Sequence, residues 1–233
     1  MKKLLASDYD QTFYINDEDI EKNKIMVEKF RNSGNLFVIA TGRSYDDFMR
    51  KKKQYNIKYD FVIINHGATI LDNDNNIIFT YTMPNEILEN LKKDLRLERS
   101  SQNFCCSGLE SRVDFEHKNL TKVQVKYDNL EYSNKMEKAL KEKYSDILNI
   151  YYVSGNSLEI ISKDINKSKA IQLLSEKINI NEKDIYTVGD GYSDIDMVTD
   201  YNGFAMKESV KELKDVAIEE INSVSELIQK IGM

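Results

Sequence analysis

Short apolar runs alternate with helix-like repeats in the first part of the chain. Leu4–Asp8, Leu36–Thr41 and Phe61–Asn65 are brief and apolar, as in strands buried on both faces. Between the first two runs, apolar residues recur at helical spacing from Ile20 to Phe30, and Gly34 stands where a helix would end. This alternation predicts a parallel sheet covered by helices on both faces.

The next stretch predicts a helix and a hairpin. Ser44 is placed to cap a helix that runs to about Tyr55. Two apolar segments, Ala68–Leu71 and Ile77–Tyr81, flank the turn-rich sequence Asp72–Asn76. Near the end of the chain the strand–helix alternation resumes, with the predicted elements Lys167–Ile178 (helix), Ile185–Val188 (strand), Ser193–Val198 (helix) and Val224–Ile231 (helix).

The middle of the chain has a different pattern, in which helices alternate with pairs of strands. Pro84, the only proline, stands at its entrance. We therefore predict one α/β core of residues 1–82 and 163–233, interrupted by an inserted α+β cap of residues 83–162. Predicted cap elements are helices at Glu86–Leu97 and Asn134–Tyr144, strands at Val123–Tyr127, Ile150–Val153 and Leu158–Ile161, and shorter strands near Phe104 and Val113.

Composition narrows the class of protein. Hydrophobic residues make up 41% and charged residues 31% of the 233 residues, which is typical of a globular protein. The net charge of −6 argues against a general nucleic-acid binder, and no apolar run reaches the ~18 residues of a membrane span. Met1–Ala6 fits a first strand better than a signal peptide. Cys105 and Cys106 are adjacent and do not suit a disulfide, so we expect a reduced, cytoplasmic setting.

Asp8 and Asp10 follow the first predicted strand. Residues i and i+2 of a strand share a side, so both carboxylates can project at the carboxyl end of the sheet, where α/β folds place ligands. Two such carboxylates repel unless a cation or a shared proton relieves them, and hard oxygen ligands beside a phosphate suit Mg²⁺. Taken alone, the pair is equally compatible with a turn that carries solvated acids.

Three further segments carry candidate chemistry. Thr41-Gly42-Arg43 ends the second strand and offers a hydroxyl, a flexible backbone and a guanidinium to a phosphoryl oxygen, although it also suits a helix-capping turn. Lys167 can offset phosphoryl charge, in competition with Lys163 and Lys169. The most specific segment is Gly189–Met197, in which glycines and acids follow a buried strand and bring Asp190 and Asp194 to its end.

In this order, the segments resemble the haloacid dehalogenase-like superfamily, and within it the Cof-type and sucrose-phosphatase-like branch with a type IIB α/β cap. The resemblance covers the whole chain: DxDxT at 8–12, TGR at 41–43, an NxGA-like segment at 65–68, Lys167 after the cap, and GDGxxDxxM at 189–197. It implies a Rossmann-like, doubly wound parallel sheet as the core.

The resemblance also implies the roles of the catalytic residues. Asp8 would attack phosphorus and become an aspartyl phosphate. Asp10 would protonate the leaving oxygen and then activate water. Thr41 would hydrogen-bond the transferring group, and Lys167 would neutralise its charge.

The remaining implied residues bind metal and substrate. Mg²⁺ would be held by Asp8, the backbone carbonyl of Asp10, and Asp190, with Asp194 completing or orienting the shell. Gly42, Arg43 and Asn65 would contact phosphate or substrate, and His66 is a further candidate. In the cap, Arg112, Lys118 and Lys122 could reach a sugar or a second phosphate, although lysine and arginine are ordinarily solvated.

Some positions depart from the family pattern. Gln11 replaces a glycine, Ser193 replaces an asparagine, and Lys167-Ser168-Lys169-Ala170 stands where Lys-Gly-x-Ala is usual. Downstream, Glu208-Ser209 stands where Asn-Ala is common. None of these changes removes a catalytic group, but they affect the loop geometry around the site.

Three functions are compatible with these residues. The leading prediction is a Mg²⁺-dependent phosphatase of small phosphorylated metabolites, most of all sugar phosphates. A phosphosugar mutase is the alternative, since similar sites serve that reaction. A metabolite-binding regulator without turnover is a third, which the presence of Asp8, Asp10, Thr41, Lys167 and Asp190 argues against.

Overall fold

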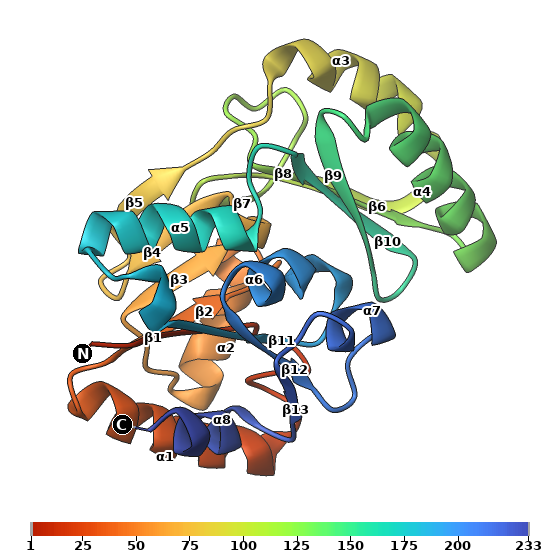
Figure 1. Ribbon diagram of the computed structural model, residues 1–233. Coiled ribbons are helices and arrows are strands. Elements are labelled where there is room, and N and C mark those ends of the chain that lie inside the picture. The colour runs from red at the N-terminus through yellow and green to blue at the C-terminus, as the bar shows by residue number, and fades with distance from the viewer. Residues whose placement is uncertain (1, 233) are drawn as a thin grey trace.

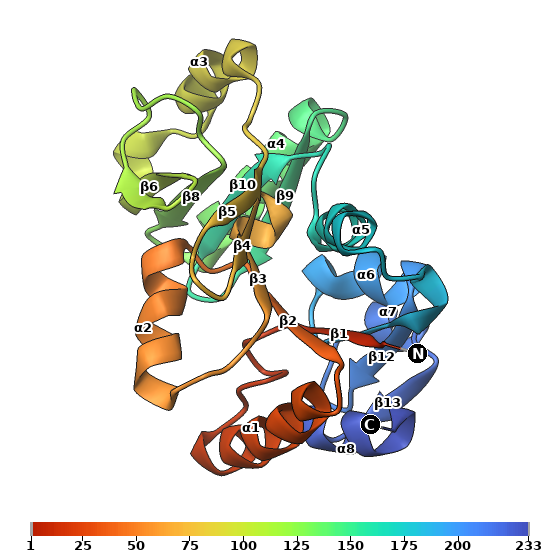
Figure 2. The same cartoon turned by 90° about the vertical axis from the view of Figure 1, so that its left-hand side faces the viewer.

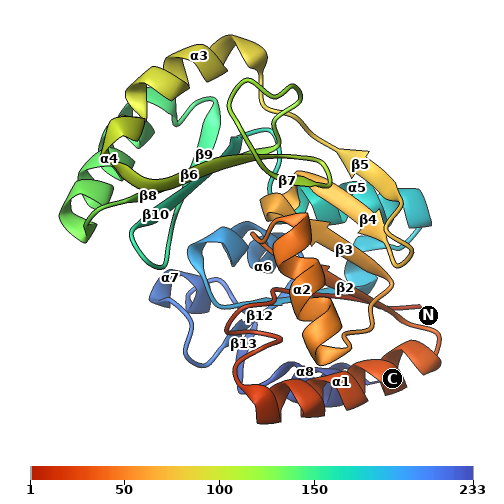
Figure 3. The ribbon, with the colours of Figure 1, turned by 180° about the vertical axis from the view of Figure 1, so that it is seen from behind.

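The structure is a computed structural model that describes residues 2–232. It contains two β-sheets, a large one and a smaller one that lies above it in Figure 1. The chain starts in the large sheet, crosses into the smaller sheet after β5, and returns before α5 (Figure 3).

The large sheet has eight strands in the order β13-β12-β11-β1-β2-β3-β4-β5. The strands from β13 to β3 run parallel, and β4 and β5 add an antiparallel hairpin at one edge. Their bounds are β1 Leu4–Ser7, β2 Leu36–Ala40, β3 Phe61–Ile64, β4 Thr69–Asp72, β5 Ile77–Thr80, β11 Ile185–Gly189, β12 Asn202–Met206 and β13 Glu219–Ile221.

Helices cover both faces of this sheet, as Figure 2 shows nearly edge-on. The first group of helices is α1 (Asp17–Asn32), α2 (Tyr45–Tyr55) and α8 (Val224–Ile231), and the second is α5 (Lys167–Ile178), α6 (Ile195–Asp200) and α7 (Lys211–Lys214). Side chains alternate between the two faces along β1, so Leu5 packs with the first group, and Leu4 and Ala6 pack with the second. The doubly wound α/β fold predicted from the sequence is confirmed.

The smaller sheet is antiparallel, with the order β7-β6-β8-β10-β9. Helices α3 (Asn85–Asp94) and α4 (Leu130–Tyr144) cover its outer face and enclose a separate apolar core, while the opposite face turns toward the large sheet (Figures 1 and 3). Its strands are β6 Ser100–Ser107, β7 Glu110–Val113, β8 Lys122–Tyr127, β9 Leu148–Val153 and β10 Ser157–Ser162.

Several details differ from the sequence prediction. The short elements β12, β13 and α7 were not predicted from the sequence. Ser44 does precede α2, but its hydroxyl bonds the Asp47 carboxylate instead of a backbone N–H of the helix. Cys105 and Cys106 are both free and buried. Among residues 2–232, every helix is too short or too polar to span a bilayer.

Candidate active site

The candidate residues gather where the central parallel strands end. β1 lies between β2 and β11, so their carboxyl ends meet at the same edge of the sheet. Asp8 follows β1 and its backbone N–H donates to the Val188 carbonyl oxygen over 2.9 Å. Thr41 follows β2 and donates likewise to Ile63 over 2.8 Å. Asp190 follows β11 directly.

Three acids form a tight cluster at this edge. Asp8, Asp190 and Asp194 each offer a carboxylate oxygen, and these atoms lie within 4.8 Å of one another. Asp194 Oδ2 accepts the backbone N–H groups of Asp190 and Gly191, each over 3.0 Å. A Cβ at Gly189 would lie 2.4 Å from the Asp194 Cβ, so only glycine leaves room for this arrangement. Gly189 therefore serves the packing of Asp194.

Lys167 is the cation at the centre of the cluster. Its Nζ donates to Asp8 Oδ1 and to Asp194 Oδ1, each over 2.6 Å, and its side chain is 2% exposed. Burial alone would lower the pKa of the ammonium, but Asp194 and Asp8 outweigh burial and raise it, so Lys167 stays charged. Lys163 and Lys169, the competing lysines, are both exposed.

The acids outnumber their cation. Burial, together with the neighbouring Asp194 and Asp190, raises the pKa of Asp8 well above its usual range despite Lys167. Burial and Asp194 raise the pKa of Asp190 to about 6. Both shifts have the same cause, which is negative charge gathered in a buried place with one ammonium to balance it.

This donor set fits a divalent cation. Carboxylate oxygens are the ligands that Mg²⁺ prefers, and a second positive charge would relieve the repulsion that raises both pKa values. Asp190 is also oriented, because the Thr12 hydroxyl donates to its Oδ1 over 2.8 Å. Asp194 has both oxygens engaged by Lys167 and the loop backbone, which leaves Asp8 and Asp190 as the freer donors.

Asp10 is held by Arg43 rather than by the cluster. The guanidinium donates through Nε to Asp10 Oδ2 over 2.8 Å and through Nη2 to Asp10 Oδ1 over 2.7 Å. Such a two-pronged contact fixes the plane of the carboxylate. Gln11, between Asp10 and Thr12, takes a φ of 60°, a conformation that glycine adopts without strain.

A cavity of about 1040 Å³ opens in front of these groups, between the large and the small sheet. Side chains of β8, α4, β9 and β10 line its far wall, including Gln124, Asn134 and Tyr152. The predicted site residues that line the cavity are Asp8, Asp10, Thr41, Gly42, Arg43, Lys167, Asp190 and Asp194, together with the further candidates His66 and Lys122.

Asn65, like the cap candidates Arg112 and Lys118, does not line the cavity. It is fully buried, and its Nδ2 donates to the Thr121 hydroxyl over 3.4 Å. Asn65 and His66 both have positive φ values, 51° and 55°, and this turn brings the His66 ring to the cavity in place of the Asn65 amide. The Asn65 amide is thus buried away from the cavity, and its contact with substrate stays a prediction.

Two features of the site were not predicted from the sequence. Thr12 was part of a motif but was given no role, although it orients Asp190. Lys122, expected to be solvated or to face the substrate, does line the cavity, but it is 1% exposed and pairs with Glu159 over 2.9 Å, a partner that was not predicted. In β8, polar residues at alternate positions resemble a solvated strand face, so only the docking of the small sheet reveals that this end of the strand is buried.

Comparison with known proteins agrees with this geometry. A family model described as haloacid dehalogenase-like hydrolase matches residues 5–113 and 98–227. The chain belongs to this family. The resemblance noted in the sequence is thereby confirmed, and the chain is a haloacid dehalogenase-like hydrolase.

Individual relatives span nearly the full chain of this hydrolase. A protein of Buchnera aphidicola subsp. Baizongia pistaciae is 24% identical over 99% of this chain and 98% of its own. The 5-amino-6-(5-phospho-D-ribitylamino)uracil phosphatase of Bacillus subtilis strain 168 is 25% identical over 92% of this chain and 88% of its own. Among solved structures, a haloacid dehalogenase-like hydrolase from B. subtilis has a TM-score of 0.84 at 18% identity, covering 99% and 100% of the two chains, and supports the fold.

Proposed function

We propose that this hydrolase is a Mg²⁺-dependent phosphatase of small phosphorylated metabolites, with sugar phosphates as its substrates. The observation that carries the proposal is the Lys167 ammonium between Asp8 and Asp194, at the floor of a cavity that also receives Asp10, Thr41 and Arg43. A nucleophilic carboxylate beside a fixed cation suits attack on a phosphate ester. The phosphatase name of the B. subtilis relative supports the same class.

In the first half of the proposed reaction, an Asp8 carboxylate oxygen attacks phosphorus and the bond from phosphorus to the ester oxygen breaks. Asp10 donates a proton to the departing oxygen, which leaves as an alcohol. Arg43 now holds both Asp10 oxygens, and an incoming phosphoryl group offers the guanidinium a competing acceptor that frees one of them. Thr41 and Lys167 stabilise the charge on the transferring group.

In the second half, Asp10 accepts a proton from water as the water oxygen attacks the phosphorus of the aspartyl phosphate. The bond from phosphorus to Asp8 breaks, which releases inorganic phosphate and restores the Asp8 carboxylate. A Mg²⁺ ion held by Asp8, Asp190 and the Asp10 backbone carbonyl would supply charge neutralisation at the phosphoryl oxygens, with Asp194 orienting this shell.

The two parts of the chain have different roles in the proposed reaction. We assign residues 1–82 and 163–233 to a catalytic core and residues 83–162 to a cap that covers the cavity. Because the side chains on the far wall come from β8, α4, β9 and β10, they are placed to choose the leaving group. A closed cap would also keep bulk water from the reacting groups.

The test is phosphate release with Mg²⁺ from a panel of sugar phosphates, 5-amino-6-(5-phospho-D-ribitylamino)uracil and p-nitrophenyl phosphate. Asp8→Asn should lower turnover by at least about 10⁴-fold, because it removes the nucleophile. Asp215→Asn, at an exposed position of the core, is the matched control. Migration of phosphate between hydroxyls without release would indicate a mutase instead, and binding without either outcome would contradict an enzyme.

A further inference from the structure

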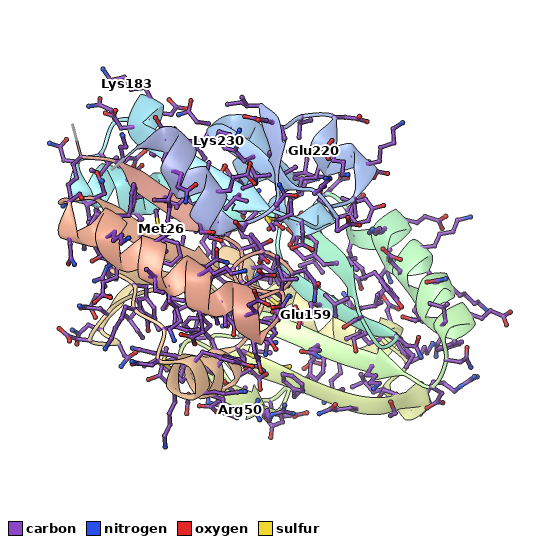
Figure 4. All side chains as sticks on the ribbon, turned by 90° about the horizontal axis from the view of Figure 1, so that it is seen from below. Met26, Arg50, Glu159, Lys183, Glu220 and Lys230 are labelled. Carbon is purple, nitrogen blue, oxygen red and sulfur yellow. The ribbon has the colours of Figure 1, made fainter. Side chains whose placement is uncertain are left out.

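Three buried ionisable side chains join the small sheet to the large one. We call His66, which follows β3, with Lys122 of β8 and Glu159 of β10, the buried triad; Glu159 is labelled in Figure 4. Their exposed fractions are 4%, 1% and 8%. Lys122 Nζ donates to Glu159 Oε1 over 2.9 Å, and His66 Nε2 contacts Glu159 Oε2. Burying such groups is costly, so their role has to be sought in what they contact.

The triad balances its own charge. Burial by itself would raise the pKa of Glu159, but Lys122 and His66 outweigh burial and lower it to about 2, so the carboxylate is ionised. Burial lowers the pKa of His66, which leaves a neutral imidazole at pH 7. One ammonium therefore faces one carboxylate, and no net positive charge remains to attract a second phosphate.

The triad instead grips the turn that presents Thr41 and Arg43 to the cavity. Lys122 Nζ donates its shortest hydrogen bond, 2.6 Å, to the Gly42 carbonyl oxygen. The His66 ring lies against Gly42 so closely that a Cβ there would be 2.3 Å from Cε1. The backbone N–H of His66 also donates to the Thr41 carbonyl oxygen over 3.0 Å. The turn is thus held from the small sheet and from the residue after β3 at once.

We propose that Lys122 and Glu159 are positioning residues for phosphoryl transfer. Glu159 orients the Lys122 ammonium, Lys122 fixes the Gly42 carbonyl, and the Thr41–Arg43 turn is thereby held in place at the phosphoryl group. This inference rests on the proposed phosphatase function. It assigns the inserted segment a part in the chemistry itself, in addition to choosing the leaving group.

The experiment uses the full chain and four variants. Lys122→Met removes the donor to Gly42 and keeps an unbranched side chain that is one atom shorter. Glu159→Gln removes the charge that orients Lys122. The double variant Lys122→Met/Glu159→Gln removes both charges, so neither is left buried without its partner. Lys126→Met, at an exposed position of the same strand, is the control. The measurements are kcat and KM on p-nitrophenyl phosphate and two sugar phosphates, inhibition by orthovanadate as a phosphoryl mimic, and Tm.

We expect Lys122→Met to lower kcat by about 10²-fold, since a small displacement of a binding group costs this much. The factor should be the same for all three substrates, with little change in KM, and orthovanadate inhibition should weaken in parallel. The double variant should recover most of the Tm lost by either single variant while its kcat stays low. If Lys122 and Glu159 had a purely structural role, the double variant would instead recover both Tm and kcat.

Two results would overturn the inference. One is a double variant with the kcat and orthovanadate affinity of the original protein. The other is a loss confined to particular leaving groups, which would make Lys122 a substrate contact. If the unaltered protein hydrolyses none of the substrates, the proposed function fails, and the comparison of orthovanadate affinities still tests the positioning of the turn by itself.

Discussion

Two clusters of buried charged side chains differ in how their positive and negative charges balance. Around Lys167, three carboxylates share one ammonium, and the pKa values of Asp8 and Asp190 are raised as a result. In the buried triad, one carboxylate meets one ammonium, and the pKa of Glu159 is lowered to about 2. The cluster around Lys167 keeps negative charge that a bound cation could neutralise, whereas the buried triad is balanced by its own residues.

The variant with the largest expected effect is Lys167→Met, which changes the balance of charge around Asp8. Losing the ammonium leaves Asp8, Asp190 and Asp194 unopposed and removes the cation beside Asp8, the proposed nucleophile, so turnover should fall by about 10³-fold. Tm should also fall, and Mg²⁺ should restore more of it than in the original protein, because the vacated charge has to be replaced. Steady-state kinetics and thermal unfolding with and without Mg²⁺ measure both effects.

Lys169→Met is the control for that variant, since Lys169 lies in the same helix but is exposed. It should keep the original turnover and Tm. An equal loss in both variants would show that this helix, rather than the charge at position 167, is what the site requires.

A second test addresses metal binding by the acids around Lys167. Thr12→Val removes the hydroxyl that donates to Asp190 and leaves the carboxylate free to rotate. Residues that orient a metal ligand typically contribute 10–100-fold to affinity, so the Mg²⁺ concentration for half-maximal activity should rise by about that factor. Thr199→Val, at an exposed position, is the matched control. An unchanged Mg²⁺ requirement would argue against Asp190 as a metal ligand.

The same contrast explains what the sequence could reveal. The residues around Lys167 lie in short motifs at strand ends, and the topology of a parallel sheet brings such ends together, so the grouping of Asp8, Thr41 and Asp190 was predictable. Lys122 and Glu159 stand on antiparallel strands whose polar residues look solvated. Their burial depends on how the small sheet docks, which no local pattern encodes. Asn65 is buried in a left-handed turn that it shares with His66, which no strand pattern indicates.

A third test uses the pH dependence of the free energy of unfolding to measure the contribution of His66 in the buried triad. The folded state holds the pKa of His66 below the usual value of about 6.5, so between these two values the unfolded chain binds the extra proton. The free energy of unfolding should therefore fall as pH drops below about 6.5, by at most about 1.4 kcal/mol per pH unit from this residue.

His66→Gln should remove that slope while keeping a side chain able to donate to Glu159. Urea unfolding at intervals from pH 7 to pH 5 measures the difference between the two proteins. Because the pKa of Glu159 is lowered in the folded state, its ionised carboxylate should stabilise the fold down to about pH 4.5. This stabilisation should be lost as pH falls from about 4.5 to about 2. Parallel profiles for the two proteins above pH 5 would contradict the assignment of a neutral, buried imidazole.

The smallest expected effect concerns Gln11, where the family pattern has glycine. The φ of 60° costs a residue with a Cβ about 1–2 kcal/mol, but glycine gains conformational freedom in the unfolded chain worth about 0.5–1 kcal/mol. Gln11→Gly should thus raise the free energy of unfolding by about 1 kcal/mol or less, and Tm by up to about 4 °C. Asn75→Gly, at a φ of 67° in the β4–β5 turn, is the control and should gain less, because asparagine tolerates this conformation. Turnover should be unchanged if Gln11 only spaces Asp10 from Thr12, whereas a raised KM would make this side chain, which lines the cavity, a substrate contact.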